Sequence, residues 1–353
     1  MRENQNFSNT LIMWYLINKR DLPWRKSKNP YLIWLSEIIL QQTRIAQGTS
    51  YYEKFVDEFA DIFALANAEE KHILKLWQGL GYYSRARNLH YTAKTIVEKY
   101  NGQFPESYDE LIKLKGIGDY TASAISSIAF NLPHAVVDGN VYRVLSRIFG
   151  IESPINESKG VKEFKVLAQQ LLEVDDPGTH NQALMEFGAL ICLPKNPKCT
   201  SCIFNNSCYA LQAKRIDVLP VKIKKLKVRK RYFNYLVIDD QQGATIIRQR
   251  KGKDIWQNLF EFPLHESKNV LLEETEMEDI ISEEFPTLKS YTFKRFNQEP
   301  IVHKLTHQTL FASFWIIQTE GRTKNHITWE DLKNIALPVL LQNFVDKYQG
   351  PYE

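Results

Sequence analysis

The sequence lacks any long apolar run. Its 353 residues are 44% hydrophobic and 24% charged, yet no stretch approaches the ~20 consecutive apolar residues that a membrane-spanning helix needs. A secretory signal peptide is also missing, because the apolar residues at 11–17 form only a short stretch within an amphipathic pattern. We therefore expect a cytoplasmic, intracellular protein without a membrane role, and a chain of this length predicts two domains.

The sequence also has little excess of charge of either sign. Its 45 Lys and Arg residues against 41 Asp and Glu residues leave a net charge of only +4, which does not decide whether it binds nucleic acid. The basic residues are clustered, however, and residues 221–231 contain seven of them and no acidic residue. We interpret residues 214–231 as a basic linker, which is either a solvated tether or a strap that follows DNA phosphates.

Cysteine is scarce, and all four cysteines lie close together. The spacing is Cys192-x6-Cys199-x2-Cys202-x5-Cys208. Such crowding indicates a metal site with four thiolate ligands, and the alternatives are a structural zinc ion, a [4Fe-4S] cluster or a pair of disulfides. Zinc sites usually contain two close Cys-x2-4-Cys pairs, whereas only one such pair is present here, so the spacing favours the cluster.

The first part of the chain, from residue 8 to about 213, has helical periodicity. Asn29 before Pro30 predicts a helix start, and apolar residues at helical spacing extend that helix to about Thr43. A capping-box pattern at residues 107–110 predicts a second helix that stops at Gly116. Another helix follows through residues 122–128, and a further one runs from Asp138 to Gly150.

The pattern changes at Tyr232 to short β-type segments around a helical acidic stretch near residues 271–285. We therefore predict a mainly α N-terminal region at 1–213 and a separate α+β domain at 232–353.

Two glycines lie between two of the predicted helices, in the segment Leu-Lys-Gly-Ile-Gly-Asp-Tyr at residues 114–120. Gly116 and Gly118 allow positive φ in a tight hairpin, and the next helix presents unpaired amides at its positive end. This arrangement can hold a phosphate group. A Gly-x-Gly pair alone is as often an inert turn, but its position upstream of the cysteines favours a helix-hairpin-helix DNA-binding motif at about 107–130.

Two acidic residues are candidates for chemistry. Asp138 precedes a helix, and its simplest role is that of an N-cap, which is worth about 1 kcal/mol. Glu37 is the only acidic residue within the apolar helix at 31–43. Burial there would raise the pKa of its carboxyl group into the range of a general acid.

Taken together, these motifs resemble those of the MutY-type adenine DNA glycosylases of the endonuclease III superfamily. The shared motifs follow one order through nearly all of the first 220 residues: Leu-Pro-Trp-Arg at 22–25, Leu-Ser-Glu-Ile-Ile-Leu-Gln-Gln-Thr at 35–43, Gly-Leu-Gly-Tyr-Tyr-Ser-Arg-Ala-Arg-Asn-Leu-His at 79–90, the hairpin, Val-Asp-Gly-Asn-Val at 137–141, Asn-Gln-Ala-Leu-Met at 181–185 and the four cysteines. The resemblance implies a monomer that binds double-stranded DNA and carries a [4Fe-4S] cluster on Cys192, Cys199, Cys202 and Cys208.

The resemblance also implies a reaction, the hydrolysis of the N-glycosidic bond of adenine mispaired with 8-oxoguanine. Glu37 would protonate N7 of the departing adenine, and Asp138 would stabilise the oxocarbenium-like sugar or bond to it transiently. Tyr120 would position the two acids, and Asn140 would help to hold the sugar or Glu37. The positions implied in contacts to DNA or to its bases are Arg25, Gln42, Thr43, Tyr82, Arg85, Gly116, Gly118 and Gln182, with Gln42 and Tyr82 as intercalating side chains.

In the C-terminal region, residues 246–250 and 256–263 resemble the core of a Nudix fold. The acidic helix lacks the arginine of the magnesium-binding Nudix motif, so we expect a recognition domain without pyrophosphatase activity. The family reads 8-oxoguanine with a Phe-Ser-His loop. The corresponding residues here are Leu305, Thr306 and His307, which keep a hydroxyl group and a histidine but replace the aromatic residue.

Two other functions compete with this interpretation. Endonuclease III-type glycosylase/lyases carry a nucleophilic lysine at the position of Tyr120, so the tyrosine disfavours lyase activity. A non-catalytic iron-sulfur DNA-binding protein would not need both Glu37 and Asp138.

Overall fold

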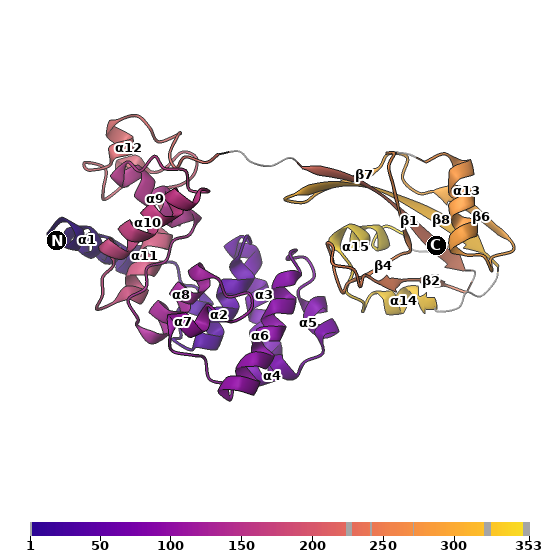
Figure 1. The fold of residues 1–353 in the computed structure, drawn as a ribbon, viewed down its shortest axis with the longest axis horizontal. Helices are drawn as coiled ribbons and strands as arrows, with labels where there is room; N and C mark the ends of the chain where they lie inside the picture. The colour runs from indigo at the N-terminus through magenta and orange to yellow at the C-terminus, as the bar shows by residue number, and fades with distance from the viewer. Residues whose placement is uncertain (1, 224–227, 241, 271, 321–325, 349–353) are drawn as a thin grey trace. The chain divides into compact units, whose positions relative to one another are not determined.

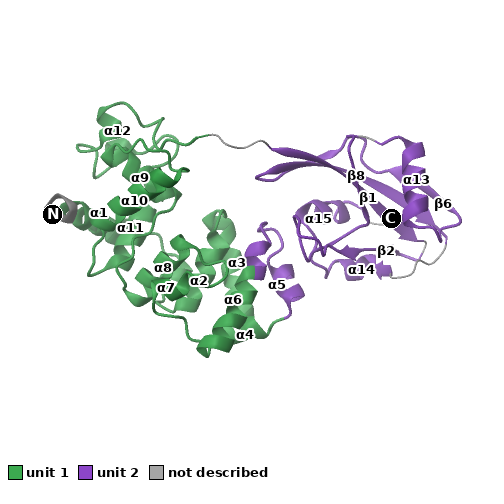
Figure 2. Cartoon of the chain, in the orientation of Figure 1, with its two compact units in different colours: residues 1–68, 88–224 green, residues 69–87, 225–353 purple. Residues whose placement is uncertain are grey.

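The computed structural model describes residues 2–223, 228–240, 242–270, 272–320 and 326–348, with side chains from residue 6 onward. The chain divides into two compact units, which are coloured separately in Figure 2. Unit 1 consists of residues 1–68 and 88–224, and unit 2 consists of residues 69–87 and 225–353. A short helical segment of the N-terminal half therefore belongs to the same unit as the C-terminal sheet.

Unit 1 is helical (Figure 1). Its elements are α1 (Arg2–Asn18), η1 (Pro23–Arg25), α2 (Pro30–Leu40), α3 (Ile45–Glu58), α4 (Ile62–Asn67), most of α6 (Ser84–Tyr100), α7 (Tyr108–Leu111), α8 (Asp119–Phe130), α9 (Gly139–Phe149), α10 (Ser158–Leu171), α11 (Pro177–Leu190), η2 (Cys199–Ser201) and α12 (Tyr209–Gln212).

The start of α2 is the predicted one. The Asn29 side chain accepts a hydrogen bond from the Tyr31 amide, and Pro30 occupies the first helical position. The helix ends at Leu40 rather than at Thr43, because Gln41 leaves the helical region and Gln42 has a φ of 57°. Gln42 and Thr43 consequently lie on a turn after the helix.

The hairpin differs from the prediction in two details. Helix α7 ends at Leu111 instead of continuing to Gly116, and the Ser107 side chain makes no capping hydrogen bond. Only Gly116 has positive φ, at 83°, whereas Gly118 is an extended residue that caps α8. A Cβ atom at residue 116 would lie 2.8 Å from Cβ of Asn88, so close packing as well as conformation requires glycine there.

Helix α9 begins and ends as predicted. Asp138 caps its N-terminus, and Gly150 ends it with a φ of 71°. One face of α9 packs with α1, α10, α11 and α12 in a hydrophobic core that holds Phe7, Leu11, Val144, Leu145, Phe164, Leu184, Phe187 and Leu219.

Unit 2 is built on a seven-stranded sheet with the order β6-β8-β1-β2-β9, in which β5 also pairs with β1 and β7 also pairs with β8. The strands are β1 (Arg229–Asp240), β2 (Ala244–Ile246), β5 (Leu264–Ser267), β6 (Tyr291–Arg295), β7 (Ile301–Lys304), β8 (Gln308–Thr319) and β9 (His326–Thr328), and β3 (Arg248–Gln249) pairs separately with β4 (Phe260–Glu261). The long strands β1 and β8 run parallel, with Arg229 opposite Gln308.

Helices cover both faces of this sheet. Alternate residues of β1 point to opposite faces, as the period of a strand requires. Phe233, Tyr235 and Val237 pack with α14 (Trp329–Leu332) and α15 (Val339–Val345), whereas Leu236 and Ile238 pack with α13 (Glu274–Glu284). The arrangement confirms the prediction of a mainly α region followed by an α+β domain.

The basic segment before the sheet is only partly a linker. Its residues 224–227 lie outside the described residues, as does Leu271 of the predicted acidic helix. Strand β1 begins at Arg229, so the last three residues of the segment belong to the sheet. No described helix is both long enough and apolar enough to cross a membrane.

Candidate active site

Glu37 lies on α2, and its carboxylate accepts a hydrogen bond from the Tyr120 hydroxyl at the start of α8. Burial raises the pKa of Glu37 to about 7. The hydrogen bond from Tyr120 and the charge of Arg25 act in the opposite direction, while the negative charge of Asp138 adds to the increase. Glu37 therefore keeps a proton in a substantial part of the molecules at neutral pH.

Asp138 precedes α9, and each of its carboxylate oxygens has a partner. Oδ1 accepts a hydrogen bond from the Val141 amide at 2.7 Å, and Oδ2 accepts one from Nδ2 of Asn140 at 2.8 Å. Burial raises the pKa of Asp138, and these hydrogen bonds and the charge of Arg143 oppose the increase. Asp138 is thus an N-cap, and it also belongs to the group of residues around Glu37.

The two carboxyl groups have different surroundings. Burial is the largest influence on both groups and raises both pKa values, but more hydrogen-bond donors oppose the increase at Asp138 than at Glu37, whose pKa reaches about 7. Such a difference separates the roles of two acids, because the protonated group can donate a proton while the ionised group stabilises positive charge. The pair can therefore perform acid-assisted cleavage of a glycosidic bond.

Tyr120 and Asn140 connect the acids to the rest of unit 1. The Tyr120 hydroxyl also lies 3.4 Å from Sδ of Met185, and burial raises its pKa well above the ordinary value of 10.0, so the phenol stays neutral. Asn140 donates to Asp138, and its Oδ1 accepts from Nη2 of Arg143 at 2.8 Å.

The segment that leads into Asp138 is held by Asn181 on α11. Its Oδ1 accepts a hydrogen bond from the Val136 amide at 3.0 Å, and its Nδ2 donates to the His134 carbonyl at 2.8 Å. Asn181 is 1% exposed, so this fixed, buried amide sets where Asp138 enters α9.

The sequence analysis missed Glu186. This α11 residue is 1% exposed and forms ion pairs with Arg20 at 2.6 Å and Arg25 at 2.8 Å. Burial alone would raise its pKa, but the hydrogen bonds from both arginines hold it at about 2. Glu186 thereby fixes Arg25, whose charge acts on Glu37. A single acidic residue in the apolar stretch 183–188 was the available signal.

Gln182 lies one turn before Glu186 and accepts a hydrogen bond from the Tyr15 hydroxyl at 3.0 Å. In the turn after α2, Gln42 is exposed and the Thr43 hydroxyl donates to the Gln41 carbonyl at 3.3 Å. The hairpin with Gly116 and Gly118 is attached to α6, because the Thr92 hydroxyl donates to the Lys115 carbonyl at 2.6 Å.

The remaining predicted contact residues belong to unit 2. Tyr82 is 44% exposed with a φ of 42°, and its hydroxyl is hydrogen-bonded to the hydroxyl of Thr306. Arg85 stacks over the ring of Trp77 at 5.0 Å, and burial lowers its pKa to about 10. Thr306 and His307 form the exposed tip of the turn between β7 and β8. Tyr82 and Thr306, which lie 224 positions apart in the chain, are thus adjacent.

All four cysteines are free thiols. Cys192 follows α11, Cys199 begins η2, Cys202 ends it and Cys208 caps α12. Within the described part of the chain, no set of three or more His, Cys, Asp or Glu side chains is arranged to hold a metal ion. The thiols nevertheless interact: burial, together with the charges of Cys192 and Cys208, raises the pKa of Cys202 to about 11.

Two arginines of α9, which the sequence analysis also missed, contact the cysteine loop. Arg147 Nη1 lies 3.5 Å from Sγ of Cys192 and 2.7 Å from the Leu193 carbonyl. Arg143 Nε donates to the Cys192 carbonyl at 2.6 Å while its Nη2 holds Asn140. The signal for this connection was the i,i+4 spacing of the two arginines within the helix that Asp138 begins. The same helix therefore joins the cysteine loop to the acidic pair.

Comparison with known proteins finds two family models that match different parts of this chain. Residues 35–170 match the HhH-GPD superfamily of base excision DNA repair proteins, and residues 234–347 match the NUDIX domain. A thermostable thymine-DNA glycosylase of known structure is 30% identical and covers 60% of this chain and 98% of its own, with a TM-score of 0.56.

Relatives that match nearly the whole chain carry one name. The adenine DNA glycosylase of Buchnera aphidicola subsp. Schizaphis graminum is 34% identical over 97% of this chain and 99% of its own length. That of Arabidopsis thaliana is 32% identical over 96% of this chain and 62% of its own. The chain therefore belongs to the adenine DNA glycosylase family of base excision DNA repair enzymes.

Proposed function

We propose that this protein hydrolyses the N-glycosidic bond of adenine mispaired with 8-oxoguanine, or with guanine, in double-stranded DNA and leaves an abasic site. The observation that carries the proposal is the partly buried Glu37, whose pKa is about 7, hydrogen-bonded to Tyr120 and electrostatically coupled to Asp138. The names of the full-length relatives support adenine as the base that is removed.

The chemistry follows from the two acids. Adenine must leave the base stack before a side chain can reach it. Protonated Glu37 then donates its proton to N7, which makes adenine a better leaving group. Positive charge develops on the sugar as the bond breaks, and the carboxylate of Asp138 stabilises it or bonds to it transiently. Water then adds to the anomeric carbon and gives its proton to the Glu37 carboxylate, which leaves the abasic sugar and restores the acid.

The reaction stops at base removal. A lyase step needs an amine that forms a Schiff base with the sugar, and position 120 carries a phenol instead. We therefore infer a monofunctional glycosylase.

Base recognition is divided between the units. In unit 1, Gln42 intercalates, while Arg25, Thr43, Gln182 and the hairpin glycines contact the DNA or the extruded adenine. In unit 2, Tyr82 intercalates like Gln42, Arg85 contacts the DNA, and Thr306 and His307 read 8-oxoguanine. The hydrogen bond between Tyr82 and Thr306 supports a common task for these two segments.

The four cysteines fit a [4Fe-4S] cluster by their donor chemistry, as four thiols in one loop that is bordered by Arg143 and Arg147. Cys192, Cys199, Cys202 and Cys208 would hold it, and the bound cluster would supply a rigid covalent tie across the loop. The purified protein should be yellow-brown, absorb near ~400 nm and contain about four irons per chain. A colourless protein with one zinc ion would contradict this assignment. Cys199→Ser should weaken DNA binding.

One assay tests the activity. Duplexes with a single 8-oxoguanine:adenine, guanine:adenine or thymine:adenine pair are incubated with the holoprotein, and strand breaks are measured with and without alkali. We expect breaks at adenine in the first two duplexes, and only after alkali. Breaks without alkali would indicate a lyase, and DNA binding without excision would indicate a non-catalytic protein.

A further inference from the structure

Arg231 is the last residue of the basic segment, but it does not face solvent. It lies on β1 with 7% of its side chain exposed. Its Nε and Nη2 atoms donate to both oxygens of Glu266 at 2.8 and 2.6 Å, and Nη1 donates to Asp254 at 2.9 Å. Nη1 also donates to Oε1 of Gln308 at 3.3 Å, and Nη2 lies 2.8 Å from the second oxygen of Asp254. Every N–H group of the guanidinium therefore has an oxygen acceptor.

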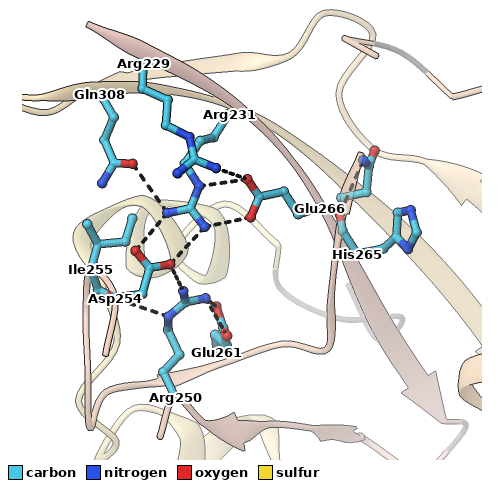
Figure 3. A network of polar contacts seen from close by, with 10 residues as sticks. Arg229, Arg231, Arg250, Asp254, Ile255, Glu261, His265, Glu266 and Gln308 are labelled. Atoms are coloured by element: carbon cyan, nitrogen blue, oxygen red, sulfur yellow. Dashed lines mark hydrogen bonds and ion pairs between the residues drawn. The ribbon is translucent and has the colours of Figure 1, made fainter. Parts of the chain in front are cut away.

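The ion pairs extend beyond Arg231, as Figure 3 shows. Arg250 bonds Asp254 at 2.8 Å and Glu261 at 2.6 Å, and Arg229 lies 3.8 Å from Glu266. Three arginines thus face three carboxylates. A charge-balanced network of this kind has one favoured geometry, because moving one member leaves a buried charge without its partner.

The network reaches the turn between β7 and β8 at two points. Gln308 is the first residue after Thr306 and His307 along β8, and its side chain accepts from Arg231. The Arg229 amide donates to the His307 carbonyl at 3.1 Å. The Leu305 amide donates to the Gln308 carbonyl at 2.8 Å, which closes the turn on itself.

Thr306 and His307 are exposed at the tip of the turn, where the Thr306 hydroxyl is hydrogen-bonded to Tyr82. Their placement depends on the base of the turn, and the rigid, buried partner at that base is the Arg231 guanidinium. Lysine could not replace it, because one ammonium group cannot bond Glu266 in a bidentate manner and reach Asp254 and Gln308 as well.

We propose that Arg231 is a positioning residue for lesion recognition: it holds the 305–308 turn through Gln308 so that Thr306 and His307 meet the base opposite adenine in one geometry. This inference rests on the proposed function, and it assigns Arg231 to base discrimination rather than to phosphate binding.

The experiment compares three variants of the holoprotein. Gln308→Met removes the side-chain link between Arg231 and the turn and leaves the backbone hydrogen bond from Arg229 to His307 in place, whereas Arg231→Met removes the central cation. Arg250→Met is the matched control, because it breaks buried ion pairs of the same network at Asp254 and Glu261. For each variant we would measure the single-turnover excision rate on 8-oxoguanine:adenine and guanine:adenine duplexes, the thermal midpoint, and hydrogen exchange of peptides covering 301–312.

We expect Gln308→Met to lower the ratio of the 8-oxoguanine:adenine rate to the guanine:adenine rate by roughly 5-fold, because one hydrogen bond is lost. The thermal midpoint should change only slightly. Arg231→Met should lower this ratio at least as much. In both variants, the amide hydrogens of residues 305–308 should exchange faster than in the wild-type protein. Arg250→Met should lower the thermal midpoint but keep the wild-type ratio, because Glu266 and Gln308 still bond Arg231 in that variant.

Two outcomes would overturn the proposal. In the first, Gln308→Met keeps both the wild-type rate ratio and the wild-type hydrogen exchange of the turn. In the second, Arg250→Met lowers the rate ratio as much as Arg231→Met does. Failure of the proposed function is recognised separately. The wild-type protein would then show no preference for 8-oxoguanine:adenine duplexes, or Thr306→Ala would leave the rate ratio unchanged. In that case, hydrogen exchange still reports whether Arg231 holds the 305–308 turn.

Discussion

The two units place carboxylates in opposite electrostatic environments. In unit 1, the pKa of Glu37 is raised to about 7 by burial, and its closest partner is a neutral phenol. In unit 2, the hydrogen bonds from Arg231 lower the pKa of Glu266. The difference lies in the partner, because a cation stabilises the ionised form and a buried phenol compensates only in part for lost water.

Glu186 shows that this contrast does not come from the unit itself. It lies in unit 1, is more deeply buried than Glu37, and yet has a pKa of about 2 because Arg20 and Arg25 bond to it. Unit 1 therefore contains cations that could lower the pKa of Glu37, but these arginines are bonded to Glu186. Position 37 keeps a proton donor because Arg20 and Arg25 form their ion pairs with Glu186 instead.

Removing the proton donor should give the largest effect. Glu37→Gln keeps the size of the side chain and its ability to bond Tyr120, so DNA binding should remain. The single-turnover rate of adenine excision should fall by a factor of at least ~10². If the variant excised adenine at a near-wild-type rate, Glu37 would be structural and the contrast with Glu266 would have no catalytic meaning.

Asp138→Asn separates the cap of α9 from the chemistry. Asparagine caps helices as well as aspartate does, so the thermal midpoint should stay close to that of the wild-type protein. Loss of the negative charge should reduce excision by about 10², because the developing positive charge on the sugar loses its partner. A variant that kept its activity would leave the N-cap as the only role of Asp138.

The pH dependence of stability should have opposite signs at Glu37 and Glu266. The folded protein binds the Glu37 proton more tightly than the unfolded chain does, so this contribution is full below pH ~4.5 and is lost as the pH rises through 7. At pH 8.5, Glu37→Gln should therefore be more stable than the wild-type protein by about 3 kcal/mol, and at pH 4 the two should be equal.

Glu266 provides the matched comparison. Its folded-state pKa is lowered, so it contributes stability above its unfolded pKa that is lost as the pH falls. Glu266→Gln should be less stable than the wild-type protein at neutral pH, with a difference that shrinks below pH ~4. Chemical denaturation across this range measures both effects, and parallel profiles for the two variants would refute the comparison.

Removing the C-terminal domain should have a smaller effect, and mainly on discrimination. A truncation after Ile223 keeps unit 1 intact at its end, because Leu219 is buried in the unit 1 core and the Val221 carbonyl accepts from the Ile155 amide. The truncated protein should still excise adenine. Its preference for 8-oxoguanine over guanine should fall by about 1 to 3 kcal/mol, the worth of one specific base contact. Equal preference in both proteins would assign lesion recognition to the remaining residues.

The smallest effect should come from the turn itself. Thr306→Ala combined with His307→Ala removes a hydroxyl and an imidazole without disturbing Arg231. The preference for 8-oxoguanine over guanine should fall, as it does in the truncated protein, but by only roughly 1 kcal/mol. Excision kinetics on the two duplexes measure it, and an unchanged preference would place the reading of the opposite base elsewhere in unit 2.

Local structure was accessible from the sequence wherever it depended on neighbouring residues. Asn29 with Pro30 predicted the start of α2, and Asp138 and Gly150 predicted both ends of α9. The predicted helix over 107–116 was too long, because Ser107 does not use its side chain as a cap and α7 ends after one turn. Caps are short-range interactions, so they could be predicted, but whether a weak helix continues depends on what it packs against.

The sequence by itself determined which residues are available for chemistry: one acid in an apolar helix, one acid at a helix start, and four cysteines in one loop. The tertiary structure decided their environments. It placed Tyr120 against Glu37, directed Arg25 to Glu186, turned Arg231 from a presumed linker residue into a buried cation, and brought Tyr82 to Thr306. The physical reason is that a pKa or an ion pair depends on distances and burial between residues far apart in the chain, and periodicity and spacing do not encode these distances.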